Sequence, residues 1–223
     1  MPDRPGRNGK VPIPILILGN TSFSEEIADL VSETPEFCVV GFVENLDRQR
    51  CESEFLGKPI HWVDTIPELV SSCRFLCGIG TTRRKSYIAQ VTSLGAQFAT
   101  LIHPTSHRSA TSTIDAGSIL SVNSVLAAHA HVGEHVIINR SVTVGHHTHI
   151  GSYTTIGPGV NLAGRCKIGE CSYIGIGATI VDGISIGSHT VIGAGSVVVA
   201  DVPDNVCVVG VPARIVKTGI DGK

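Results

Sequence analysis

The chain carries little charge and has no long apolar run. Of its 223 residues 16% are charged, and the formal net charge is −2, so no basic surface for nucleic acid is expected. No stretch reaches the roughly 18 consecutive apolar residues of a membrane-spanning helix. Residues 1–10 are polar and lack the apolar core of a signal peptide, so we expect a frayed tail there.

The cysteines form no Cys-x-x-Cys pair. Their number, seven, is odd, and no signal peptide accompanies them. This combination indicates reduced thiols, which fill space in a cytoplasmic protein.

The chain does contain an unbroken repeat of six residues. Every sixth residue from Ile114 to Val198 is Ile, Leu or Val, often with a Gly directly after it. A period of six fits neither a helix nor an alternating strand, and it predicts a parallel β-helix. Three hexapeptides would close one triangular coil of about 18 residues, with the aliphatic side chain inside the column.

The fifteen aliphatic positions predict about five stacked coils. The β-helix domain is therefore expected over residues 112–200. The periodicity stops after Val198, and residues 201–223 are expected to form a tail that covers the open strand edges of the last coil.

Residues 11–105 show a different pattern, in which short apolar runs alternate with helical ones. We expect strands at 13–18, 37–43, 74–79 and 97–102, helices at 22–32 and 82–94, and a short helix that opens at Thr65. Ser22 or Ser24 is the expected N-cap of the first helix. This alternation predicts a small parallel α/β sheet with a Rossmann-like arrangement, which residues 107–113 would link to the coils.

The carboxyl edge of this sheet is a candidate nucleotide site. The first turn, Gly19-Asn20-Thr21, lacks the dinucleotide pattern Gly-x-Gly-x-x-Gly, so NAD is not expected. Its free amides could bind a phosphate, or the turn could be purely structural. Glu44 follows the second strand, where an acid often contacts a ribose hydroxyl, although it could equally be a solvated acid.

Histidines concentrate on the repeat. None of them occupies an inward position, so all should point outwards, and the coil length predicts that His129 stacks on His147 and His131 on His149. They are His129, His131, His135, His146, His147, His149 and His189.

A metal site and an acyl-transfer site are the two functions that such histidines suggest. Carbonic anhydrases with a similar prism use a second His two coils after the first, but that spacing is absent here, so no metal is expected. For acyl transfer, an outward His can accept a proton from an attacking amine, and a backbone N–H at a Gly can hold the oxyanion.

Three motifs carry a resemblance to a known family. They are Val144-Gly145-His146-His147-Thr148-His149-Ile150-Gly151, then Leu162-Ala163-Gly164 with Ile168-Gly169, and the closing Gly210-Val211-Pro212-Ala213-Arg214. With them the chain resembles the hexapeptide acyltransferases of the sialic acid O-acetyltransferase group, which includes the bacillosamine and perosamine N-acetyltransferases.

The resemblance implies a left-handed β-helix and a homotrimer with acetyl-CoA bound between neighbouring columns. It implies that His146 is the general base and that the Gly164 amide binds the acetyl carbonyl. Gly145 would lie beside the cofactor, and Pro212-Ala213 would pack near its adenine. The expected activity is acetyl-CoA-dependent N-acetylation of a nucleotide-linked 4-amino sugar. Sugar O-acetylation and a decayed trimeric scaffold are the alternatives.

Two positions depart from the family pattern. Relatives carry an acid directly after the catalytic His, where this chain has His147, which would orient His146 or contact the sugar. Relatives also carry Gly-x-x-Gly-His in the first turn, where this chain has Ser22 and Phe23.

Overall fold

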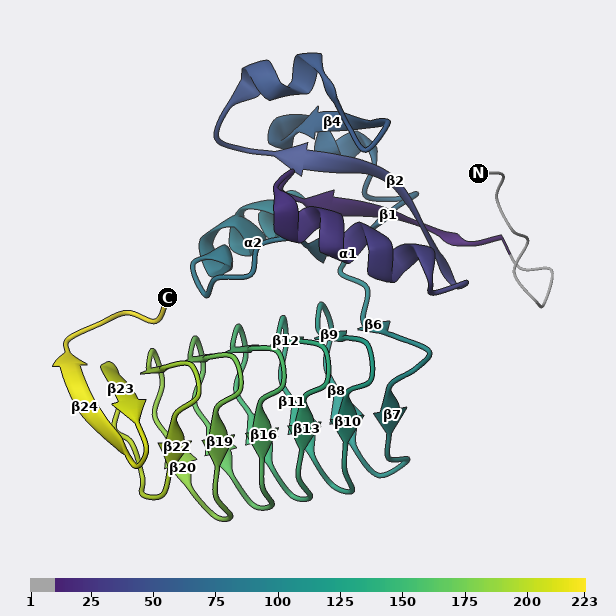
Figure 1. The fold of residues 1–223 in the computed structure, drawn as a ribbon. Helices are drawn as coiled ribbons and strands as arrows, with labels where there is room; N and C mark the ends of the chain where they lie inside the picture. The colour runs from purple at the N-terminus through teal and green to yellow at the C-terminus, as the bar shows by residue number, and fades with distance from the viewer. Residues whose placement is uncertain (1–10) are drawn as a thin grey trace. The chain divides into compact units, whose positions relative to one another are not determined.

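The computed structural model describes residues 11–223, so the tail expected at residues 1–10 lies outside them. The described chain divides into two units, one of residues 11–79 and 84–99 and the other of residues 80–83 and 100–223 (Figure 1). None of the helices described has the length and apolar character of a membrane span.

The N-terminal unit is built on a five-stranded sheet in the order β3-β4-β2-β1-β5. Strands β4, β2, β1 and β5 are parallel, and β3 pairs with β4 antiparallel. Helix α1 contacts β1, β2 and β5. The elements are β1 (Ile13–Leu18), α1 (Ser22–Ser32), β2 (Phe37–Glu44), η1 (Arg48–Glu52), β3 (Glu54–Phe55), β4 (Lys58–Trp62), η2 (Val63–Glu68), β5 (Arg74–Cys77) and α2 (Arg84–Ser93).

This unit confirms the expected α/β class, but several of its elements differ from the expected ones. Thr21, not Ser22 or Ser24, precedes α1 with an extended backbone, and its N–H donates to Ser24 Oγ at 3.3 Å. The helix expected to open at Thr65 is the 3₁₀ helix η2, which begins at Val63. Strand β4 was not expected, because Lys58 and Pro59 make its start look like loop.

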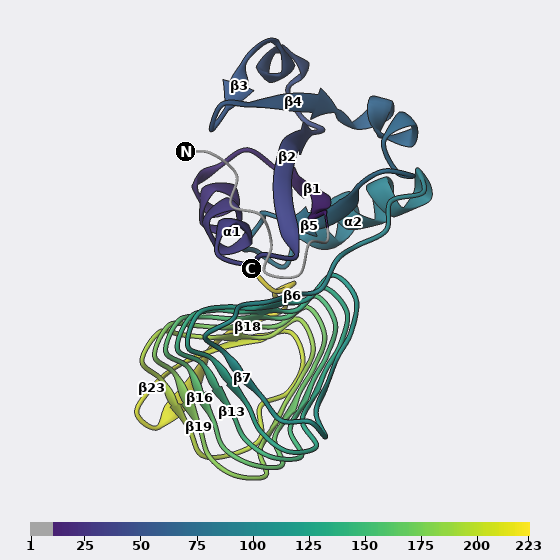
Figure 2. The same ribbon diagram turned by 90° about the vertical axis from the view of Figure 1, so that its right-hand side faces the viewer.

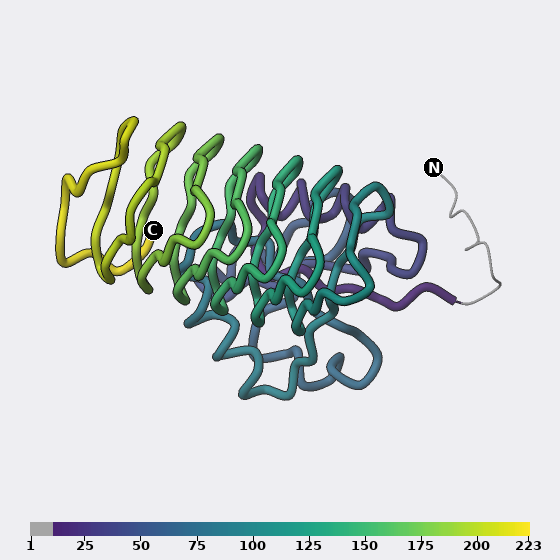
Figure 3. Tube along the Cα trace, turned by 90° about the horizontal axis from the view of Figure 1, so that it is seen from below, coloured from purple at the N-terminus to yellow at the C-terminus, as the bar shows by residue number. Residues whose placement is uncertain are grey.

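The C-terminal unit is a left-handed β-helix whose triangular cross-section is seen end-on in Figure 2 and whose coils lie side by side in Figure 3. Its 17 two-residue strands alternate among three parallel sheets. They are β6 (Leu101–Ile102), β7 (His107–Arg108), β8 (Thr113–Ile114), β9 (Ile119–Leu120), β10 (Val125–Leu126), β11 (His131–Val132), β12 (Ile137–Ile138), β13 (Thr143–Val144), β14 (His149–Ile150), β15 (Thr155–Ile156), β16 (Asn161–Leu162), β17 (Lys167–Ile168), β18 (Tyr173–Ile174), β19 (Thr179–Ile180), β20 (Ser185–Ile186), β21 (Val191–Ile192) and β22 (Val197–Val198).

Each strand pairs with the strand one coil later, so that Val144 pairs with Leu162 and Leu162 with Ile180. The predicted inward residues form one continuous buried cluster along the column. A fully buried aliphatic side chain contributes roughly 1.5–3 kcal/mol, so this repeated burial is the main stabilising term of the column.

The small residues at the corners add hydrogen bonds between coils. Ser118 Oγ donates to the carbonyl of Gly133 at 2.7 Å and accepts from the N–H of Val136 at 2.9 Å. Both groups are buried, so leaving either unpaired would be costly. Hydroxyls at the same position of later hexapeptides repeat the donation, namely Ser124, Thr148, Thr154 and Ser172.

The column begins earlier than the sequence predicted. The fourth strand expected at 97–102 is correct only in its first half: Phe98 bridges Phe75 of β5 in parallel, whereas Leu101 and Ile102 pair with β9 of the column. The segment expected as a linker at 107–113 contains β7, which pairs with β10. Arg108 pairs with the inward residue Leu126 but is itself exposed at the open end of the column. A charged residue at this position interrupts the aliphatic pattern, so the repeat is not recognised there.

The tail closes the other end of the column. Strand β23 (Val206–Gly210) continues one sheet, and β24 (Ala213–Thr218) pairs with it antiparallel. The last residues run back along the coils, where the Gly222 N–H donates to the His189 carbonyl at 3.0 Å.

Candidate active site

His146 and His147 lie in the turn between β13 and β14. Gly145 precedes them, and a Cβ there would lie 2.4 Å from the carbonyl carbon of Ala163 in the next coil, so this position requires glycine. His147 adopts a left-handed backbone with φ of 58°. The tight turn therefore presents both imidazoles on the outside of the column, where both side chains are exposed.

Gly164 lies one coil after His146, directly beneath its ring. An ideal Cβ on Gly164 would lie 2.6 Å from His146 Nε2 and 2.9 Å from Asp182 Oδ1. The Gly164 N–H donates to no acceptor within residues 11–223. Only a glycine therefore allows Nε2 to lie this close to the Gly164 backbone, whose N–H is an unused donor.

The two adjacent imidazoles contact each other directly. Their Nδ1 atoms are 3.1 Å apart, and the rings meet nearly at right angles, at 84°. His147 also packs on His129, one coil earlier, with ring centroids 4.8 Å apart, which confirms the predicted stacking.

Positive groups surround His147. Partial desolvation, followed by the charges of His129, His146 and Arg165, lowers the pKa of the His147 imidazole below its ordinary value of 6.5. Arg165 lies one coil after His147 and is held by Asp182, with its Nη2 2.7 Å from Oδ2. His147 therefore remains neutral at neutral pH.

The sequence did not single out Arg165 and Asp182 as part of this site. Both follow from the 18-residue stacking, since Asp182 lies two coils after His146 and Arg165 one coil after His147. The 18-residue spacing is thus sufficient to place both residues beside the two imidazoles.

The remaining histidines of the column lie apart from this turn. His131 stacks on His149 with centroids 5.9 Å apart, and its Nδ1 lies 2.7 Å from Thr113 Oγ1. His135 is buried although it points outwards, and it stacks on Tyr153 at 5.2 Å. Among residues 11–223 no three His, Cys, Asp or Glu side chains gather in a way that could hold a metal ion.

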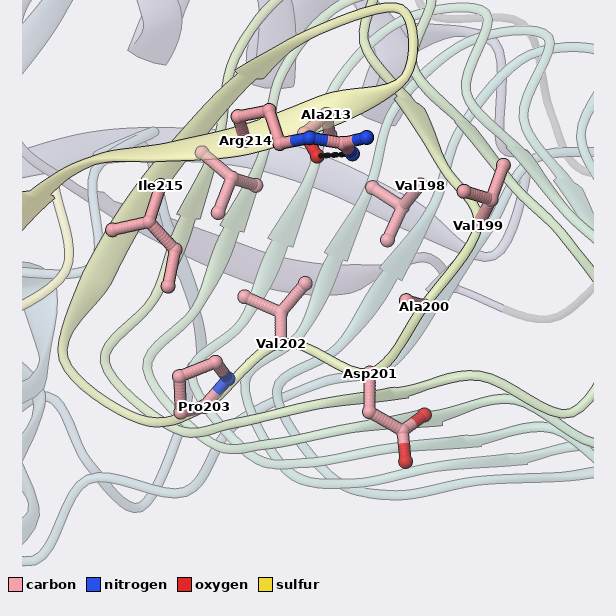
Figure 4. A pocket seen from close by; sticks show the side chains of 10 residues that line it. Val198, Val199, Ala200, Asp201, Val202, Pro203, Ala213, Arg214 and Ile215 are labelled. Carbon is pink, nitrogen blue, oxygen red and sulfur yellow. Dashed lines mark hydrogen bonds between the residues drawn. The ribbon is translucent and has the colours of Figure 1, made fainter.

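An apolar pocket lies where the tail crosses the end of the column (Figure 4). Its floor is the segment Val198–Pro203, and Ala213, Arg214 and Ile215 of β24 form its other side. Ala213, one of the two residues expected near adenine, lines this pocket, and Pro212 directly precedes it.

The candidate nucleotide residues of the N-terminal unit lie together at the carboxyl ends of β1 and β2. Gly19 has a φ of 90°, and its N–H donates to the Val43 carbonyl at 2.8 Å. Asn20 Oδ1 accepts from Arg50 Nη1 at 3.0 Å, and Arg50 also lies 3.6 Å from Glu44 Oε2. Arg50 thus joins the two expected ligand segments.

Glu44 is neither solvated nor free to turn. Its side chain is 7% exposed. Its Oε1 accepts from the backbone N–H groups of Asn45 at 2.9 Å and Leu46 at 2.7 Å. The carboxylate therefore holds the loop after β2, and Oε2 is the oxygen turned towards Arg50.

Comparison with known proteins identifies the repeat. The family described as bacterial transferase hexapeptide (six repeats) matches residues 129–164 and 165–200. No curated protein matches the sequence.

Several solved structures are similar to the chain over nearly its whole length. Perosamine N-acetyltransferase from Caulobacter crescentus, solved as a histidine variant with CoA and GDP-perosamine, is 27% identical with a TM-score of 0.84, covering 92% of this chain and 97% of that one. The acetyltransferase domain of PglB from Neisseria gonorrhoeae, solved with acetyl coenzyme A, is 26% identical with a TM-score of 0.84, covering 92% and 100%. WeeI from Acinetobacter baumannii is 25% identical with a TM-score of 0.81, covering 91% and 99%.

The repeat, the two-unit organisation and these similarities agree with one another. The chain is an acyltransferase whose residues 129–200 match the hexapeptide family, and it is similar over nearly its whole length to perosamine N-acetyltransferase and to the acetyltransferase domain of PglB.

Proposed function

We propose that the protein transfers an acetyl group from acetyl-CoA to the amino group of a nucleotide-linked 4-amino sugar, with His146 as the general base. The observation that carries this proposal is that His146 Nε2 lies next to the backbone of Gly164, whose N–H donates to no acceptor within residues 11–223, on the outside of the column. Similar proteins were solved with CoA, acetyl-CoA and GDP-perosamine.

The chemistry follows from these two groups. The sugar nitrogen attacks the thioester carbonyl carbon, and its proton passes to His146 Nε2 as the C–N bond forms. The carbonyl oxygen becomes negative and accepts from the Gly164 N–H. The tetrahedral intermediate then expels the CoA thiolate, which takes the proton from the His146 imidazolium.

The cofactor would extend along one edge of the column. Ala200, in the floor of the tail pocket, lies three coils after His146 in the same register, a span of about 14 Å at the spacing of paired strands. The acetyl group would lie beside Gly145 and Gly164. The apolar pocket formed by Ala213 and its neighbours, with Pro212 next to it, would take the adenine end.

The N-terminal unit would bind the nucleotide at the carboxyl edge of its sheet. The turn Gly19-Asn20-Thr21 precedes helix α1, where the partial positive charge of a helix N-terminus favours a phosphate. The N–H groups of Gly19 and Thr21 are not free as the sequence suggested, because they donate to the Val43 carbonyl and to Ser24 Oγ. Glu44 Oε2 and Arg50 would face the ribose or the base.

We propose further that the chain forms a homotrimer with the acyl site at the seam between columns. The apolar side chains of Val211, Ile215 and Val216 are exposed by 72%, 50% and 60% at the end of the column. Such a group of exposed apolar residues favours burial against another surface. None of the seven cysteines, all of which lie within residues 11–223, forms a disulfide, which favours a reducing compartment such as the cytoplasm.

The test is thiol release from acetyl-CoA with UDP-, dTDP- and GDP-linked 4-amino sugars, alongside the matching 4-hydroxy sugars. The proposal expects release with at least one amino sugar and a loss in kcat/KM of about 10²- to 10⁴-fold in His146→Ala. Release with hydroxy sugars alone would indicate O-acetylation. An absence of both release and acetyl-CoA binding by calorimetry would indicate a scaffold.

A further inference from the structure

The contact between the two adjacent imidazoles restricts where their protons can be. The Nδ1 atoms of His146 and His147 are 3.1 Å apart, so a hydrogen bond between them needs one Nδ1–H donor and one bare Nδ1 acceptor. A neutral imidazole carries one proton, so the choice at Nδ1 fixes the state of Nε2 in the same ring.

The two arrangements differ in their chemistry. If His147 donates, His146 must carry its proton on Nε2, and the nitrogen that faces Gly164 cannot accept another. If His146 donates, its Nε2 keeps a lone pair on the side of Gly164. A general base at Nε2 requires the second arrangement.

The groups around His147 favour its role as acceptor. A protonated His147 would have two N–H donors and could no longer accept from His146. Partial desolvation lowers the pKa of His147, and it falls further because a protonated His147 would lie against the ring of His129 and near the Arg165 cation. The Asp182 carboxylate, two coils after His146, is paired with Arg165 at 2.7 Å.

We infer that His147 is a positioning residue whose Nδ1 accepts a hydrogen bond from His146 Nδ1–H and so keeps the lone pair of His146 Nε2 facing Gly164. This inference rests on the proposed function, in which His146 is the base. It assigns the orienting task to a neutral histidine, at the position where the family resemblance places an acid.

The inference gives three substitutions different outcomes. In His147→Phe the acceptor is gone, so neither the tautomer nor the orientation of the His146 ring is fixed; the mixed tautomers cost a few-fold, and the misplaced ring brings the fall in kcat/KM to about 10²-fold. In His147→Asn the amide oxygen can accept, and Asn tolerates the left-handed backbone, so most of the activity returns. In His147→Asp the carboxylate accepts and its charge raises the pKa of His146, so the acidic limb of kcat/KM moves to higher pH.

The direct test is nuclear magnetic resonance of the full-length protein labelled with ¹⁵N-histidine, with the His146 signals assigned by their loss in His146→Ala. We expect His146 in the wild type at pH 8 to carry its proton on Nδ1, to keep it there in the Asn and Asp variants, and to populate both tautomers in His147→Phe. His131→Phe, which changes a ring outside this turn, is the control and leaves the His146 signals and kcat/KM unchanged.

Two results would overturn the inference. One is a wild-type His146 that carries its proton on Nε2. The other is a His147→Phe variant that retains both the Nδ1–H tautomer and full kcat/KM. The tautomer of His146 is measured without substrate, so this test does not depend on the proposed function. If His146 carries the proton on Nδ1 but the protein acetylates none of the acceptors, the proposed function fails and the inference about the tautomer does not.

Discussion

The Gly164→Ala substitution should separate activity from stability. The new Cβ would lie 2.6 Å from His146 Nε2 and 2.9 Å from Asp182 Oδ1, both at the ends of side chains. The φ of Gly164 is outside the left-handed region, so the alanine backbone is unstrained. The fold can therefore absorb the methyl group by displacing the two side chains rather than the backbone.

The displacement sets the expected loss of activity. His146 Nε2 must retreat from 2.6 Å to at least the ordinary contact distance of 3.4 Å, a movement of about 0.8 Å. A misplacement of about 1 Å at a reacting group costs on the order of 10²-fold in rate. That corresponds to about 2.7 kcal/mol of transition-state stabilisation.

The assay is kcat/KM for thiol release together with the thermal midpoint of unfolding. We expect the rate to fall about 10²-fold while the midpoint stays within a few degrees, because alanine stabilises a compatible backbone by only roughly 0.4–1 kcal/mol. Gly159→Asn, at an open position with φ of 66°, is the control and should change neither quantity. Full activity in Gly164→Ala would refute the placement of the reacting atoms beside Nε2.

Three further substitutions or reactions test the column and the core. Gly145→Ala places a Cβ 2.4 Å from the backbone of Ala163, so it should lower the free energy of unfolding by about 1–3 kcal/mol or more, as measured by denaturant titration. Ile156→Ala, at a fully buried position, should lower the free energy of unfolding by roughly 2–5 kcal/mol. Ile176→Ala, at a position that is 57% exposed, should lower it by less than about 0.5 kcal/mol. Equal losses in the two variants would contradict the assigned interior of the column. Burial raises the pKa of the Cys77 thiol to about 11, so iodoacetamide at pH 8 should modify Cys77 only after unfolding, and rapid labelling of the native protein would contradict its burial.

The sequence predicted the column because one physical requirement repeats. Each inward position faces only other side chains, so it admits Ile, Leu or Val at a period that no helix or plain strand shares. The prediction of the column was wrong at its first coil, where the inward position is not buried. Arg108 lies in the inward register but is exposed at the open end, so the first coil could not be recognised.

The boundary of the small sheet failed for a different reason. Leu101 and Ile102 are two apolar residues that suit a strand of either unit, and a short apolar run does not specify its partner. The N-cap was also displaced by one residue, because Thr21, Ser22 and Ser24 are all suitable caps and the backbone geometry decides among them.

Within the site, the sequence predicts only those contacts that join residues 18 positions apart on neighbouring coils. The 18-residue coil correctly paired His129 with His147, and the same arithmetic leads to Asp182 beside Gly164. The hydrogen bond between His146 and His147 could not be predicted, because two neighbouring residues of a turn can point apart or together, and the left-handed φ of His147 decides which.

A crystal structure of the protein with coenzyme A and an amino-sugar nucleotide would test the central claim most directly. The account predicts that the sugar nitrogen lies within hydrogen-bond reach of His146 Nε2, about 2.6–3.2 Å or through one water, with the thiol beside Gly164. A complex in which coenzyme A binds away from this turn, or in which the amine faces a different side chain, would contradict it.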